Sequence, residues 1–136
     1  MKEHYIEEYT VRESDIDELN HVSNIKYVEW IQEISKAHWY KITKGTGYDV
    51  KYFWVVSSHF IEYKASALLD QQITIETYVE KFEKAYSYRA VEVKDKETGK
   101  LLMKSLTKWC MMDMETKRIT RVPTELFDLF SLETKI

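Results

Sequence analysis

Two ionisable side chains, Asp17 and His21, lie four residues apart in the connection that leads into the longest amphipathic segment of the chain. A carboxylate and an imidazole are both suited to proton transfer near neutral pH. If the segment is a helix, its first backbone N–H groups have no partner inside the helix and are available to the same small volume. Such a convergence suits attack on a polarised carbonyl group.

The helix that must position these groups is expected to begin after Ser23, a favourable N-cap residue. Apolar and aromatic side chains then recur at spacings of three and four residues, which is the pattern of one buried helical face. The members of this face are Tyr27, Trp30, Ile31, Ile34, Ala37 and His38. We expect a helix of roughly five turns that reaches about Ile42, because two glycines in residues 45–48 end the pattern.

The rest of the chain is rich in β-branched and aromatic residues, which favour strands. Residues 5–13 predict a strand with one solvent-facing side. Four longer strands are expected at residues 53–64, 71–81, 86–94 and 100–114. Residues 95–100 supply a hairpin turn with Gly99, and Pro123 begins a short C-terminal helix to about Phe130. This order predicts an α+β fold in which one helix is buried against a curved antiparallel sheet.

Length and composition limit the classes of function. The 136 residues indicate one domain, residues 1–136, and a net charge of −3 gives no general attraction to nucleic acid or anionic membranes. The single Cys110 cannot form an intrachain disulfide, and the N-terminus lacks the apolar core of a signal peptide. The longest apolar run, residues 52–56, is far short of the ~20 residues that span a bilayer. We expect a soluble cytoplasmic protein without nucleic-acid or membrane partners.

A single helix can cover only one face of such a sheet. The apolar and aromatic residues of the other face, and the long edge strands, would then remain exposed. Association of identical chains removes both problems. We therefore expect a homodimer or a dimer of dimers.

The segment around Asp17 also carries a resemblance to a known family. Its motif reads Asp15-x-Asp17-x-x-x-His21-Val22-x-Asn24-x-x-Tyr27. Followed by the long helix, it resembles the hotdog-fold thioesterases, most nearly the 4-hydroxybenzoyl-CoA thioesterases and related acyl-CoA or acyl-carrier-protein thioesterases. Residues 70–77 and 121–123 resemble the family's central strand and the entry to its last helix. The resemblance covers nearly the whole chain and implies a hotdog fold, with one long central helix wrapped by a curved antiparallel sheet.

The resemblance implies roles for particular residues. Asp17 corresponds to the family's catalytic carboxylate, a general base on water or a nucleophile toward a thioester carbonyl. A backbone N–H at about Asn24 would polarise the thioester oxygen. Basic side chains would contact the phosphates of the substrate, and the candidates are Lys117, Arg118 and Arg121. The implied activity is hydrolysis of an acyl-CoA or acyl-carrier-protein thioester.

The sequence departs from the family pattern at two positions. Ser23 replaces the first residue of the usual Asn-Asn pair. In the plant acyl-carrier-protein branch an Asp-x-Asn-x-His set is used, and here Leu19 replaces its Asn. A mechanism that needs a side-chain amide at this position would have to take it from Asn20 or Asn24. His21 then either orients Asp17 or water, or only holds the loop.

Several residues of the chain can also be interpreted as having a purely structural role. Asp15 most readily stabilises the turn. Tyr27 belongs either to the core or an interface or to a substrate-binding wall, and His59 either to a pocket or to a dimer seam. Cys110 in its apolar strand reads as a packed thiol. The four histidines show no metal-ligand spacing, so no metal or other cofactor is expected.

Two alternatives to hydrolysis remain open from the sequence. A hotdog protein can bind an acyl thioester without cleaving it, and Leu19 at the position of the family Asn keeps that alternative open. A dehydratase of the same fold is the second alternative. The relevant branches often place Gly beside the catalytic His, whereas Val22 stands there in this chain.

Overall fold

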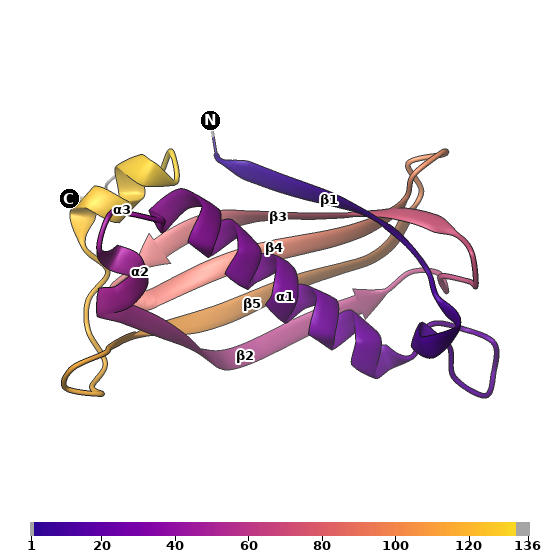
Figure 1. Ribbon diagram of the computed structural model, residues 1–136, viewed down its shortest axis with the longest axis horizontal. Coiled ribbons are helices and arrows are strands. Elements are labelled where there is room, and N and C mark those ends of the chain that lie inside the picture. Colours follow the sequence, from indigo (N-terminus) through magenta and orange to yellow (C-terminus); the bar gives the residue numbers. More distant parts are fainter. Residues whose placement is uncertain (1, 133–136) are drawn as a thin grey trace.

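A long helix crosses one face of a five-stranded antiparallel sheet in the computed structural model, which describes residues 2–132 (Figure 1). The strands are β1 (His4–Thr10), β2 (Tyr52–Tyr63), β3 (Gln72–Glu83), β4 (Tyr86–Asp95) and β5 (Leu101–Asp113). The helices are η1, a short 3-10 turn (Glu13–Asp15), α1 (Asn24–Thr43), α2 (Tyr48–Lys51) and α3 (Thr124–Leu129). The strand order is β1-β3-β4-β5-β2. The predicted α+β arrangement is confirmed.

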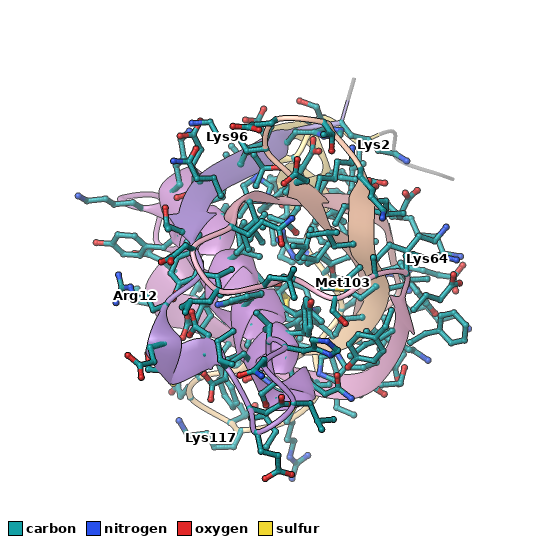
Figure 2. All side chains as sticks on the ribbon, turned by 90° about the vertical axis from the view of Figure 1, so that its right-hand side faces the viewer. Lys2, Arg12, Lys64, Lys96, Met103 and Lys117 are labelled. Carbon is teal, nitrogen blue, oxygen red and sulfur yellow. The ribbon has the colours of Figure 1, made fainter. Side chains whose placement is uncertain are left out.

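The long helix α1 buries the face that its periodicity predicts. Ser23 is its N-cap and accepts a hydrogen bond from the backbone N–H of Ile25 at 3.1 Å. Trp30, Ile31 and Ile34 are buried against the sheet, and each large apolar side chain so buried contributes roughly 1.5–3 kcal/mol. Figure 2 looks at the molecule from the end where α1 begins and shows the sheet curving around the helix.

The strands bury alternate residues, as a sheet covered on one face requires. Ile73, Ile75, Thr77 and Val79 of β3 are all buried beneath α1. The turn between β4 and β5 closes at Gly99, whose φ of 75° lies in the left-handed region that glycine adopts without strain. The predicted hairpin at residues 95–100 is therefore confirmed.

The two outermost strands, β1 and β2, each have one edge without a strand partner in the part of the chain that the structure describes. β2 is the longer of them and carries more exposed large apolar side chains. Its exposed large apolar side chains are Val55, Val56, Phe60 and Tyr63. Such an edge is available for pairing with another strand.

Two local predictions need correction. The first strand ends at Thr10 and not at Glu13, because the backbone N–H of Arg12 donates to the Asp15 carboxylate at 2.9 Å and the chain turns into η1. The short helix α2 was not predicted. It begins after Gly47, which has a φ of 93°, and its four residues are too few to produce a helical periodicity in the sequence.

Candidate active site

The segment between η1 and α1 folds into a narrow loop that exposes Asp17. Ile16 and Val22 form an antiparallel bridge across its base. Within the loop the N–H of Asp17 donates to the carbonyl of His21 at 2.9 Å, and the N–H of Asn20 donates to the carbonyl of Asp17 at 3.1 Å. Asn20 has a φ of 63°, a conformation that Asn tolerates better than most residues. The loop is therefore fixed by its own backbone.

The carboxylate of Asp17 is held by main-chain groups. Its Oδ1 accepts hydrogen bonds from the N–H of Leu19 at 2.9 Å and of His21 at 3.4 Å. Within residues 2–132 no group donates to its Oδ2. One oxygen orients the side chain, and the other is available to a water molecule or a carbonyl carbon.

Asp15 has a different environment although it lies only two residues away. Its side chain is buried, and Oδ2 accepts from the hydroxyl of Tyr9 at 2.6 Å and from the N–H of Arg12 at 2.9 Å. The ammonium group of Lys26 is 3.8 Å from Oδ1. Burial and the Asp15 carboxylate raise the pKa of Tyr9 to about 12, so its hydroxyl remains a donor. The prediction that Asp15 stabilises the turn is confirmed.

The N-terminus of α1 presents a free donor beside this loop. Ser23 accepts from Ile25 through its side chain and from Lys26 through its carbonyl, at 3.1 and 3.0 Å. The N–H of Asn24, the first residue of α1, makes no hydrogen bond within the described part of the chain. It lies at the positive end of the helix dipole, where a developing negative charge is stabilised.

One cleft of about 580 Å³ contains these groups. The predicted site residues Asp17, His21, Asn24 and Tyr27 all line it. Tyr27 is buried, and its hydroxyl accepts from the N–H of Ala67 at 3.1 Å, so it forms part of the core as well as of the cleft wall. Leu19 and Ile25 are exposed apolar side chains at the same cleft.

The imidazole of His21 does not contact the Asp17 carboxylate. Its Nδ1 is 3.3 Å from the hydroxyl of Ser66, which follows β2. Sequence reasoning did not find Ser66, and no local signal marks it. It reaches the cleft because the N–H of Val22 donates to the carbonyl of Ala67 at 3.0 Å and joins two distant segments.

The other predicted contact residues lie elsewhere. His59 is half-buried in β2, its Nδ1 is 2.8 Å from the hydroxyl of Thr107, and burial lowers the pKa of its imidazole. Lys117, Arg118 and Arg121 follow β5, in the loop that is joined to Lys51 by the hydrogen bond from the N–H of Met114 at 2.9 Å. This loop lies at the Tyr52 end of β2, whereas the cleft lies at the Tyr63 end (Figure 1).

Twelve residues of extended chain separate the two ends of β2, a length of roughly 36 Å at ~3.3 Å per residue. The basic loop and Asp17 therefore do not meet within one chain. Among residues 2–132, no three His, Cys, Asp or Glu side chains are grouped so that they could hold a metal ion. None of the helices described is both long and apolar enough to cross a membrane.

Comparison with known proteins assigns this chain to a family. The model of the acyl-ACP thioesterase N-terminal domain matches residues 2–130. The chain belongs to the acyl-ACP thioesterase family. A comparison with curated proteins finds no match. Membership of this family supports hydrolysis of CoA or acyl-carrier-protein thioesters as the general activity.

Solved structures show the same fold at low sequence identity. YbaW, a probable thioesterase from Escherichia coli, is 20% identical with a TM-score of 0.78, and the alignment covers 91% of this chain and 94% of YbaW. The protein SAV2348 from Staphylococcus aureus, solved in complex with CoA, is 15% identical with a TM-score of 0.83, covering 100% of this chain and 89% of SAV2348.

A third similar structure is Slr0204, a 1,4-dihydroxy-2-naphthoyl-CoA thioesterase from Synechocystis. It is 12% identical with a TM-score of 0.80, and the alignment covers 95% of this acyl-ACP thioesterase family member and 96% of Slr0204. These matches confirm the hotdog fold. The resemblance stated from the Asp17 motif is likewise confirmed at the level of the superfamily.

Proposed function

We propose that this acyl-ACP thioesterase family member hydrolyses an acyl-CoA or acyl-carrier-protein thioester in the Asp17 cleft. The observation that carries the proposal is the meeting, in one cleft, of an accessible carboxylate oxygen of Asp17 and the N–H of Asn24, which has no partner among residues 2–132. A thioester carbonyl bound there is polarised through its oxygen by the helix N-terminus. Its carbon is then open to attack by the carboxylate, or by a water molecule that the carboxylate deprotonates.

The groups around these two atoms have supporting roles in the proposal. The N–H groups of Leu19 and His21 fix Oδ1 of Asp17, so the carboxylate does not have to be reoriented for the reaction. His21 assists by tying the loop to Ser66 through its imidazole. Tyr27 supports the floor of the cleft through its contact with Ala67.

The site is open in a single chain, and we propose that a second copy completes it. Leu19 and Ile25 are exposed at the cleft, and the free edge of β2 begins beside it at Tyr63. Two β2 edges that pair antiparallel about their centres bring the Tyr63 end of one chain to the Tyr52 end of the other. The dimer would cover these apolar side chains.

This pairing also gives a role to the basic loop. Lys117, Arg118 and Arg121 lie at the Tyr52 end of β2, which in such a dimer is next to the Asp17 cleft of the other copy. Cationic side chains at that place would contact the phosphates of CoA or of a carrier-protein prosthetic group. The CoA complex of the similar SAV2348 is consistent with a CoA thioester as substrate.

The decisive experiment is release of free thiol from a panel of acyl-CoA and acyl-carrier-protein thioesters of different chain length. Asp17→Asn retains an oxygen that can accept from Leu19 and His21, so the loop should keep its structure. The variant should lose about 10²–10⁴-fold in kcat, as expected when a general base is removed. A circular dichroism melt should be unchanged.

Glu18→Gln is the matched control because this neighbouring carboxylate is exposed in the same loop. Its kcat should equal that of the unsubstituted chain. Undiminished turnover in Asp17→Asn would exclude the mechanism. If no thioester in the panel releases thiol but acyl-CoA binds, the chain is a non-catalytic binding protein instead.

A further inference from the structure

A second cavity, of about 270 Å³, lies beneath α1 and away from the Asp17 loop. Its volume is near the lower limit of ligand pockets, which begin at roughly 300 Å³. The walls are mainly aromatic and come from α1, β2 and β3. These side chains are Trp39, Tyr52, Phe53, Trp54 and Phe82. A small, largely apolar group would fit such a space.

The inner end of this cavity is polar. Ser35 of α1, Ser87 and Arg89 of β4 and Trp109 of β5 line it, and all four are buried. The indole Nε1 of Trp109 has no hydrogen-bond partner in the part of the chain that the structure describes. Buried donors are nearly always paired in folded proteins. This nitrogen is an exception, but it has almost no accessible surface, so the polar end of the cavity is defined by Arg89 and the two serine hydroxyls.

Arg89 adds a positive charge at the same place. Only 5% of its surface is exposed, and no carboxylate of residues 2–132 forms an ion pair with it. Its two hydrogen bonds both leave from Nη1, to Nδ1 of His38 at 2.8 Å and to the hydroxyl of Thr77 at 3.1 Å. A guanidinium has five N–H donors, so most of its capacity is unused.

Burial of a cation without an anionic partner is costly. The partners of Arg89 are neutral, since an imidazole nitrogen that accepts from a guanidinium is unprotonated. An anion in the cavity would supply the missing charge, and a carboxylate matches the planar fork of Arg89 with two parallel hydrogen bonds. The exposed Lys36 and the half-buried Asp49 also line the cavity, but most of the remaining wall is aromatic and suits an apolar ligand chain.

We propose that this cavity holds the distal end of the acyl group and that Arg89 recognises a carboxylate there, so that the preferred substrates are thioesters of dicarboxylic acids. The inference rests on the proposed thioesterase function. In the antiparallel dimer, the cavity lies at the Tyr52 end of β2 and so faces the Asp17 cleft of the second copy. The thioester carbonyl would lie in the Asp17 cleft of one chain, and Arg89 of the other chain would bind the carboxylate at the far end of the acyl group.

The test compares two CoA thioesters of equal chain length, adipoyl-CoA with a terminal carboxylate and hexanoyl-CoA with a terminal methyl group. The unsubstituted chain should show a kcat/KM for adipoyl-CoA that is about tenfold or more above that for hexanoyl-CoA, as a charged hydrogen-bonded pair provides. Arg89→Met should reduce this ratio to about one. Lys108→Met removes a cation from the other side of β5 and should leave the ratio unchanged.

Binding separates a failure of this inference from a failure of the proposed catalysis. In Asp17→Asn, calorimetry should show tighter binding of adipoyl-CoA than of hexanoyl-CoA whether or not the unsubstituted chain hydrolyses either compound. Equal binding of the two compounds would overturn the inference, as would a preference that persists in Arg89→Met. Should Arg89→Met fail to fold, the ratio in the unsubstituted chain decides the question alone.

Discussion

The backbone N–H of Leu19 donates to Oδ1 of Asp17 at 2.9 Å, although Leu19 as a residue is 69% exposed. The family branch that carries Asn at this position can offer a side-chain amide to the reaction. Here the contact with the carboxylate comes from the main chain, which any residue except proline supplies. The departure at Leu19 therefore does not remove the support of Asp17.

Replacing Leu19 by Asn should accordingly change little. The Leu19→Asn variant keeps the N–H that holds Asp17, so kcat/KM for thioester hydrolysis should change by less than about threefold, which is under ~0.7 kcal/mol in activation free energy. Leu19→Ala serves as the control for loss of the apolar side chain. A rise above about tenfold in Leu19→Asn alone would show that the missing amide limits the reaction.

The donor proposed at Asn24 can be deleted by a substitution that preserves the helix. Proline at the first position of a helix is favourable because its missing N–H has no helical acceptor there. Ser23, which would precede it, has φ −62° and ψ 140°, a conformation that a following proline accepts. Asn24→Pro should therefore lower kcat by about 10²–10³-fold without unfolding α1.

Asn24→Ala is the matched control, because it removes the side chain and keeps the N–H. Its kcat should stay within about threefold of the unsubstituted value. Steady-state hydrolysis and circular dichroism are measured on both variants. Equal losses in the two variants would assign the effect to the Asn24 side chain and would contradict a role for the backbone donor.

Local patterns in the sequence predicted most of this fold and the segment around Asp17 in the candidate site. Ser23 and the spacing from Tyr27 to His38 predicted α1, and alternation predicted β3, because both depend on neighbouring residues. The pairing of β1 with β3 and the bond between His38 and Arg89 depend on contacts across the sheet, which no local pattern carries. For the same reason the sequence could not show that Lys117 lies far from Asp17 within one chain.

The buried His38 should make the fold sensitive to acid. Burial, with a contribution from the Arg89 charge, lowers the pKa of His38 from 6.5 to about 3. At pH values between about 3 and 6.5, His38 binds a proton in the unfolded chain and not in the folded chain. The free energy of unfolding should therefore fall as the pH falls below 6.5, by about 1.4 kcal/mol per pH unit from this group once the unfolded histidine is protonated.

Urea unfolding between pH 7 and pH 5 measures this dependence, in a range above the titration of most carboxylates. His38→Gln keeps an oxygen that can accept from Arg89 and should remove the His38 contribution to the slope. His21→Gln is the control, because His21 is exposed and forms no ion pair within residues 2–132, whereas His4 is 2.6 Å from the Glu76 carboxylate. An equal slope in His38→Gln and the unsubstituted chain would show that His38 is protonated in the folded state.

The free edge of β2 should be the contact between two copies. Phe60 is 66% exposed on this strand and Val55 is exposed five residues earlier, whereas Ile6 is 55% exposed on the opposite edge strand β1. Lysines on a strand edge oppose pairing with a further strand.

Light scattering should give the unsubstituted chain at least twice the 16.4 kDa mass of one chain. The double variant Val55→Lys, Phe60→Lys should be monomeric, and its thioester hydrolysis should fall because the second copy no longer covers the Asp17 cleft. Ile6→Lys places the same charge on the other edge and should leave both mass and hydrolysis unchanged. A monomeric unsubstituted chain, or a dimer that only Ile6→Lys dissociates, would exclude assembly through β2.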